Sequence, residues 1–369
     1  MSFKDTLFKS TPNFKWKENI TEKSDCFSAS YQFDCYKDKK NNVILITPFL
    51  DIKKPQIQDY HISLINLNNN EVVNKLKDPK DRVFTVRYFQ DKNTKKDYLI
   101  SEDKTYTIMV WDLGNEPSEC KKIYEVEVKY DGLVYSCLLM FDINKIYAVT
   151  SSLGQNNFTQ VIDLTDSGKI IDITDSQGLL VYYLDYWHNE NAETDEQKHV
   201  IIQASKNKIL LTEFPNNTTY HSINLEQQYP YVLSGIVFKN KNGEDLFAFS
   251  ATYGLVQIIN LANKQEVFKT TDFVNREVHL HSFVKWNEKY LLLNDCQQSR
   301  IIIFDMEDGF KIKSKVVSPE MFFDRFMMKI QHPKYGECLL SIGIDWKIKL
   351  FVNRSVNPNI RLKINWKMI

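Results

Sequence analysis

The sequence predicts an all-β fold in which one four-stranded antiparallel unit recurs seven times. Three observations lead to this prediction. The chain of 369 residues carries short runs of β-branched and aromatic residues, and Asp, Asn, Lys and Gly turns separate these runs. One type of strand ending recurs at nearly constant spacing. No segment has a sustained helical period, which excludes helical solenoids.

The clearest unit runs from Val83 to Tyr130 and contains VFTVRYF, KDYLISEDKTYTIMVWDL and KKIYEVEVKY. These runs predict an inner strand, two middle strands and an outer strand. Trp111 and Asp112 end the third strand, so an apolar residue followed by an acidic one marks this position of the unit.

The same ending recurs along the whole chain. The second residue of each ending is spaced from the next by 46, 51, 50, 47, 45 and 47 residues: Asn66, Asp112, Asp163, Glu213, Asn260, Asp305 and Val352. We assign the structural anchors of the repeat to Asn66, Trp111, Asp112, Asp163, Asn260 and Asp305. One unit cannot bury both faces of its sheet, whereas units packed radially bury each other. The sequence therefore predicts a single seven-bladed β-propeller.

The spacing sets the expected blade boundaries. They are 24–80, 81–130, 131–175, 176–228, 229–271, 272–318 and 319–369. Both chain ends also contain a run typical of a strand, near 13–20 and at 360–369. Either run can complete the outer edge of the last blade, and we favour the N-terminal one as the strand that closes the ring.

The repeated ending resembles that of the WD-repeat family, in which an apolar strand ends in Trp-Asp or a similar pair. The resemblance covers nearly the entire chain and implies a β-propeller that serves as a protein-interaction scaffold. Only the second blade carries the full Trp-Asp, and the Gly-His pair common in such repeats is absent. Gly114 also stands where substrate receptors of ubiquitin ligases carry Arg, and no Phe-Arg-Arg-Gly typical of phosphoinositide-binding propellers is present.

Composition limits the function classes. Lys and Arg total 47 and so do Asp and Glu, and this balance argues against a nucleic-acid binder. The six cysteines are scattered without metal-ligand spacing, as expected of reduced core thiols. No secretory signal or membrane-spanning segment is recognisable. We expect an intracellular protein, in the first place cytoplasmic, with cytoskeletal or ciliary, nuclear and mitochondrial locations left open.

No catalytic or nucleotide-binding motif is present, so we expect a non-catalytic protein without cofactor, metal or small-molecule substrate. His279 and His281 lie two residues apart and could chelate a metal if they share a strand face, or they could be ordinary loop and packing residues. Glu102, Asp103 and Asp345 are interpreted as acidic loop residues with turn roles.

The loops divide between two faces. Loops between blades share one face with the loops that join the two middle strands of a blade, and this face is expected to carry aromatic and arginine side chains. Such residues are enriched in interface hot spots. The candidate partner-binding residues are Arg82, Tyr106, Tyr229, Tyr231, Tyr253, Phe273, Arg276, Arg300, Phe322, Arg325 and Trp346, and Phe158 lies in the same set of loops.

Two further expectations concern this face. Arg276, Arg300 and Arg325 are predicted to form one patch near blades six and seven. The long loop TPFLDIKKPQIQDYH, with Pro48 and Pro55, is predicted to overhang the same face. The alternative is that the aromatic residues plug the channel mouth and the arginines pair with local carboxylates.

The favoured function is a non-catalytic scaffold within a multi-subunit complex. Two alternatives remain open: an RNA- or ribonucleoprotein-associated propeller that stacks bases on the aromatic residues, and a propeller enzyme with its catalytic groups at the channel mouth.

Overall fold

The computed structural model describes most of the chain. The described residues are 14–19, 33–49, 60–91, 94–128, 137–142, 145–151, 159–165, 168–173, 181–194, 198–226, 231–271, 273, 280–295, 298–317, 324–343 and 347–353. Their named helical elements are single 3₁₀ turns: η1 (Pro117–Glu119), η4 (Thr252–Gly254) and η5 (Met306–Asp308). The protein is all-β, as predicted.

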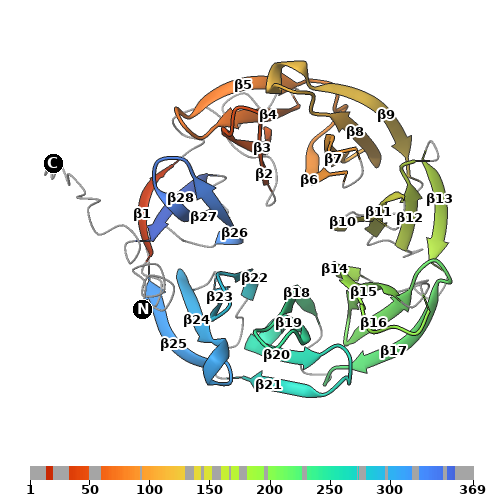
Figure 1. Ribbon diagram of the computed structural model, residues 1–369, viewed down its shortest axis with the longest axis vertical. Helices are drawn as coiled ribbons and strands as arrows, with labels where there is room; N and C mark the ends of the chain where they lie inside the picture. The colour runs from red at the N-terminus through yellow and green to blue at the C-terminus, as the bar shows by residue number, and fades with distance from the viewer. Residues whose placement is uncertain are drawn as a thin grey trace, which may run out of the picture.

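Seven four-stranded antiparallel sheets form a ring around a central opening (Figure 1). The strands of the first four blades are β2 (Asp34–Lys37), β3 (Val43–Phe49), β4 (His61–Asn66), β5 (Glu71–Leu76); β6 (Val83–Gln90), β7 (Asp97–Asp103), β8 (Thr107–Asp112), β9 (Lys121–Glu127); β10 (Cys137–Asp142), β11 (Ile146–Ser151), β12 (Thr159–Asp163), β13 (Lys169–Ile173); and β14 (Val181–His188), β15 (His199–Ser205), β16 (Lys208–Glu213), β17 (Thr218–Asn224).

The remaining blades contain β18 (Val232–Lys239), β19 (Asp245–Ala251), β20 (Leu255–Asn260), β21 (Glu266–Thr270); β22 (Leu280–Lys285), β23 (Tyr290–Asp295), β24 (Arg300–Asp305), β25 (Lys311–Val317); and β26 (Asp324–His332), β27 (Gly336–Gly343), β28 (Ile348–Asn353), β1 (Phe14–Asn19). In six blades the strands follow chain order from the inside outward. In the seventh, β1 pairs antiparallel with β28 at the outer edge. The second candidate strand, 360–369, lies outside the described residues.

The hydrophobic core lies between blades. Each of the seven clusters of buried residues combines side chains from two neighbouring blades. Trp111 of β8, for example, is 2% exposed and packs with Ile44 and Ile46 of β3. The indole Nε1 of Trp111 donates a hydrogen bond to Ser101 Oγ of β7 at 3.0 Å. The radial arrangement therefore buries sheet faces that one blade alone would expose to water.

The repeated strand ending has one structural role. In six blades its second residue is the last residue of the third strand, and in the last blade Val352 is the penultimate residue of β28. The oxygen Oδ1 of five of these residues accepts a hydrogen bond from the backbone N–H two positions later, at 2.8–3.1 Å: Asn66, Asp112, Asp163, Asn260 and Asp305. This is an Asx turn, which explains why the position favours Asp or Asn. In the fourth blade Glu213 occupies this position.

Polar side chains also join neighbouring inner strands. Asp34 Oδ2 of β2 accepts a hydrogen bond from Tyr88 N of β6 at 2.9 Å. Asp185 Oδ2 of β14 accepts one from Val237 N of β18, also at 2.9 Å. Burial raises the pKa of both carboxyls, and the Arg87 guanidinium of β6 opposes this rise in each case. These contacts fix the inner strands that line the central opening.

Two acidic residues expected in a loop belong to a strand. Glu102 and Asp103 end β7 and are both buried. Asp103 does have the expected turn role, because its Oδ1 accepts hydrogen bonds from Thr105 N and Thr105 Oγ1. Glu102 instead faces the next blade, where Thr150 Oγ1 donates to Glu102 Oε2 at 3.4 Å. Strand β7 therefore extends through both residues instead of ending before them. Each carboxylate accepts a hydrogen bond inside the protein.

Candidate functional site

The face that carries the predicted partner-binding residues is here called the junction face. Its described parts are the loops between blades and the turns between second and third strands, among them 77–82, 104–106, 206–207, 252–254 and 298–299. Both kinds of connection lie at the same end of the strands, because the strands of each sheet are antiparallel.

Two tyrosines of the junction face have left-handed backbone conformations. Tyr106 precedes β8 with φ 63°, and Tyr253 precedes β20 with φ 61°. The corresponding turn of the fourth blade has Asn207 at φ 56°. Asn tolerates this conformation more readily than an aromatic residue does. The Tyr253 side chain is 44% exposed and that of Tyr106 is half-buried, so both strained positions present aromatic surface at this face.

Further aromatic contacts lie at the same face. The rings of Tyr182 and Tyr231 meet edge to face with centroids 5.0 Å apart, and both side chains are half-buried. The Arg82 guanidinium carbon lies 6.0 Å from the centre of the Phe84 ring. Tyr182 was not predicted for this site. It belongs to an aromatic run of an inner strand, and the sequence does not indicate that its ring contacts Tyr231.

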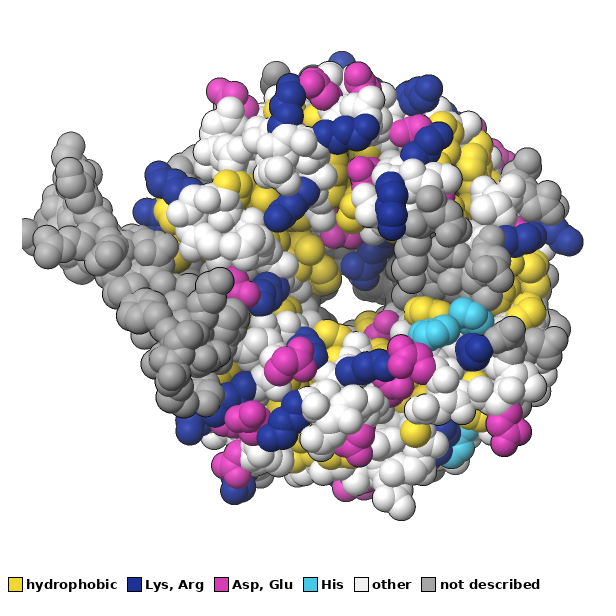
Figure 2. Space-filling model, in the orientation of Figure 1, with side chains coloured by type: hydrophobic (Ala, Val, Ile, Leu, Met, Phe, Trp, Pro, Cys, Tyr) yellow, Lys and Arg dark blue, Asp and Glu magenta, His cyan; other side chains and the backbone are white. Residues whose placement is uncertain are grey.

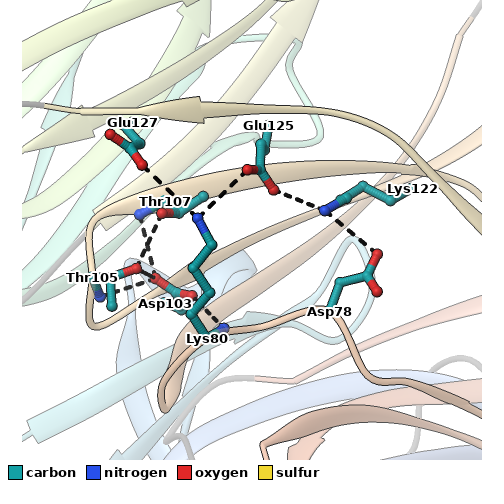
Figure 3. Close-up of polar contacts among 8 residues, drawn as sticks. All are labelled: Asp78, Lys80, Asp103, Thr105, Thr107, Lys122, Glu125 and Glu127. Carbon is teal, nitrogen blue, oxygen red and sulfur yellow. Dashed lines mark hydrogen bonds and ion pairs between the residues drawn. The ribbon is translucent and has the colours of Figure 1, made fainter.

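The charged groups where the first two blades meet compensate one another (Figure 3). Lys80 Nζ lies 3.5 Å from Glu125 Oε1 and 3.9 Å from Glu127 Oε1. Lys122 Nζ lies 2.8 Å from Glu125 Oε2 and 3.5 Å from Asp78 Oδ2. The hydrogen bond from Lys122 is the main reason that the pKa of Glu125 is lowered. These ion pairs lie at the surface and add little stability. Because each lysine is paired with a carboxylate, this part of the surface has no net charge concentrated in one sign.

Two predicted partner-binding residues are mostly buried. Phe273 is 2% exposed and packs edge to face on Phe304, with ring centroids 6.3 Å apart. The Arg300 side chain is 14% exposed, and its Nε lies 2.7 Å from Oδ2 of the buried Asp295 in the same hairpin. Arg300 thus satisfies its charge inside its own blade, as in the alternative considered for the three arginines.

The side chains of the other predicted residues lie outside the described part of the structure. Tyr229, Arg276, Phe322, Trp346 and Phe158 lie outside the described residues, and of Arg325 only the backbone in β26 is described. His279, Asp345 and Pro55 of the first-blade loop also lie outside the described residues, and of His281 only the backbone in β22 is described. Pro48 belongs to β3 rather than to that loop.

The opposite face carries interspersed charges of both signs around the central opening (Figure 2). Its turns contain exposed ion pairs such as Lys239 with Glu190 at 2.7 Å and Lys40 with Glu116 at 2.6 Å. Such a mixed surface is typical of a solvated face.

The described His, Cys, Asp and Glu side chains are the groups that could hold a metal ion or act as nucleophiles. No three His, Cys, Asp or Glu side chains there converge as ligands of a metal ion. Cys35, Cys120 and Cys338 are free thiols. Burial raises the pKa of both Cys120 and Cys338 to about 12, so these two thiols stay protonated and unreactive near neutral pH. In the described part of the chain no helix has the length and apolar character that crossing a membrane requires.

Comparison with known proteins shows the fold through structure. No protein-family model and no curated protein sequence matches the chain. The β-propeller domain of Cps50 (Swd1) from Myceliophthora thermophila aligns with 89% of this chain and 98% of its own, with a TM-score of 0.61 and 12% identity. Raptor from Chaetomium thermophilum aligns with 96% of this chain at a TM-score of 0.64 and 9% identity, and the match spans 30% of Raptor. The chain therefore has the seven-bladed β-propeller fold.

Proposed function

We propose that this protein is a non-catalytic scaffold that binds segments of other proteins on its junction face and belongs to a larger assembly. The observation that carries this proposal is the pair of tyrosines held in left-handed turns. An aromatic residue in this conformation costs free energy that Asn would largely avoid, and strained residues persist where their side chains serve a function. Tyrosine is also among the residues most enriched in interface hot spots.

The charges of the described turns on this face agree with a protein partner. Lys104 and Lys206 are exposed in two of these turns, close in sequence to Tyr106 and Asn207. An aromatic anchor beside a lysine suits a segment that combines apolar and acidic side chains. The similarity to propellers of Swd1 and Raptor supports the architecture that such a role requires.

The test replaces both strained tyrosines with asparagine. Tyr106→Asn/Tyr253→Asn removes the aromatic groups but retains the left-handed turns, so we expect the free energy of unfolding to change by no more than about 1 kcal/mol. Affinity purification followed by quantitative mass spectrometry should recover specific partners with the parent protein and lose most of them with this variant.

A matched control replaces Lys37, Lys39 and Lys40 of the opposite face with alanine, which we expect to leave the recovered partners unchanged. If the lysine variant loses the partners and the tyrosine variant retains them, the proposed face is wrong. If the junction face binds RNA instead, the parent protein will bind single-stranded RNA with an affinity that falls steeply as salt rises.

A further inference from the structure

Two histidines and a tyrosine converge on the opposite face of the fourth blade. His188 is the last residue of β14 and His199 the first of β15, and the two are directly paired across the strands. Tyr186 precedes His188 by two positions, so both side chains project from the same side of β14. Figure 2 shows histidine side chains beside the central opening over this blade.

The phenol oxygen of Tyr186 lies within hydrogen-bonding distance of a ring nitrogen of each histidine. Tyr186 Oη lies 2.6 Å from His199 Nδ1 and 3.3 Å from His188 Nδ1. The two imidazole rings are 5.1 Å apart between centroids. His199 is 8% exposed, whereas His188 is exposed, so the group has one anchored side and one side open to solvent.

We propose that Tyr186, His188 and His199 bind one late first-row transition-metal ion, of which Zn²⁺ is the simplest probe. Imidazole nitrogen and phenolate oxygen suit such ions better than they suit Mg²⁺ or Ca²⁺. In a tetrahedral zinc site with metal–nitrogen distances of about 2.0–2.1 Å, two ligand atoms lie roughly 3.4 Å apart. The 3.3 Å separation of Tyr186 Oη from His188 Nδ1 is close to this value. The 2.6 Å separation of Tyr186 Oη from His199 Nδ1 must increase by about 0.8 Å.

The surroundings allow an ion to enter. The charged neighbours near His188 include Glu190, which forms an ion pair with Lys239 at 2.7 Å. The Glu190–Lys239 ion pair is neutral as a whole and solvent-exposed, so it does not repel a cation as a lone lysine would. The site lies on the face opposite the proposed partner-binding surface. The test of one proposal therefore does not depend on the outcome of the other.

Isothermal titration calorimetry of the chelator-treated, full-length protein with ZnCl₂ tests the site. We expect saturable binding at one ion per chain, a higher melting temperature with Zn²⁺ than without it, and no such rise with Mg²⁺.

The decisive variant is His188→Gln, which changes an exposed side chain and should lower the Zn²⁺ affinity at least about tenfold. Tyr186→Phe keeps the ring but removes the phenol oxygen, and it should alter the visible absorption of the Co²⁺-substituted protein. His221→Gln is the matched control, because His221 lies on the outer strand of the same blade. Absence of saturable Zn²⁺ binding in the parent protein, or equal affinity in His188→Gln, overturns the proposal. If His188→Gln fails to fold, the Co²⁺ spectrum of Tyr186→Phe decides in its place.

Discussion

At the scale of single residues, the repeated Asp or Asn works together with the two residues that flank it. The residue before this position is buried in all seven blades, and it is Thr212 in the fourth blade and an apolar residue such as Ile65 or Trp111 in the others. The residue after it, such as Leu67 or Leu113, donates its backbone N–H to the start of the second strand at 2.9–3.0 Å. One tripeptide therefore ends a strand, begins a turn and places an apolar side chain between blades. This combination explains why the ending can be recognised from sequence.

Asp163 is an anchor whose carboxyl pKa is set by its neighbours. Burial alone would raise the pKa of its carboxyl, but hydrogen bonds from Lys145 and Thr165 outweigh burial and lower the pKa below the ordinary 3.8. A lowered pKa gives stability that is present above the ordinary pKa and is lost as pH falls through the folded-state pKa. We expect Asp163→Asn, which keeps the turn acceptor, to be less stable than the parent protein at pH 7. Urea unfolding should show the two proteins converging below pH 3.8, and a constant difference down to pH 2 would contradict this account.

Trp111 carries the largest predicted cost of a single substitution. Trp111→Ala removes a side chain buried between the first two blades and leaves Ser101 Oγ without the indole donor. Such a deletion costs about 3–5 kcal/mol of the free energy of unfolding. Trp111→Phe should lose clearly less, because it keeps most of the apolar contact. Guanidinium unfolding measures both, and a Trp111→Ala midpoint equal to that of the parent protein would mean that the core is packed differently.

At the scale of elements, the register of a hairpin determines which side chains meet, and sequence spacing alone does not reveal this register. The sequence drew attention to His279 and His281 because residues two apart share a strand face. The histidines that the structure brings together, His188 and His199, are separated by a turn whose length conceals their pairing. The left-handed turns are similar in this respect, since Tyr106 and Tyr253 are not residues from which a positive φ would be predicted. Their conformation depends on the hairpin as a whole rather than on local preference.

Gly235 shows how closely two inner strands approach each other. A Cβ at this position would lie 2.6 Å from Phe247 Cε2 and 2.9 Å from Tyr183 Cε1, and Phe247 is fully buried. Gly235→Ala should therefore lower the free energy of unfolding by about 1–3 kcal/mol through overpacking. In a Phe247→Leu background the same substitution should cost less, because the smaller side chain leaves room. A double-mutant cycle of unfolding free energies checks this, and strict additivity would show that the ring does not restrict Gly235.

At the scale of the whole molecule, every blade depends on both neighbours, since each described core cluster spans two blades. This is why the sequence could predict the number and order of blades: the alternation that buries both sheet faces recurs in every unit. The exposure of the candidate partner-binding residues could not be predicted with equal success. Phe273 lies in a connection and Arg300 begins β24, and in sequence both positions resemble an exposed loop. Phe273 nevertheless packs on Phe304, and Arg300 pairs with the buried Asp295.

The pairing of β1 with β28 gives the last prediction. The seventh blade receives its outer strand from the far end of the chain, and removal of that strand leaves the backbone groups of β28 without partners. Because the cores of the seventh blade are shared with the sixth and the first, the loss should spread around the ring. We expect deletion of residues 1–19 to lower the melting temperature strongly or to cause aggregation, whereas deletion of residues 1–12 should change the melting temperature little. Differential scanning calorimetry and light scattering measure both effects. Equal melting temperatures for the two truncated proteins would show that β1 does not hold the ring together.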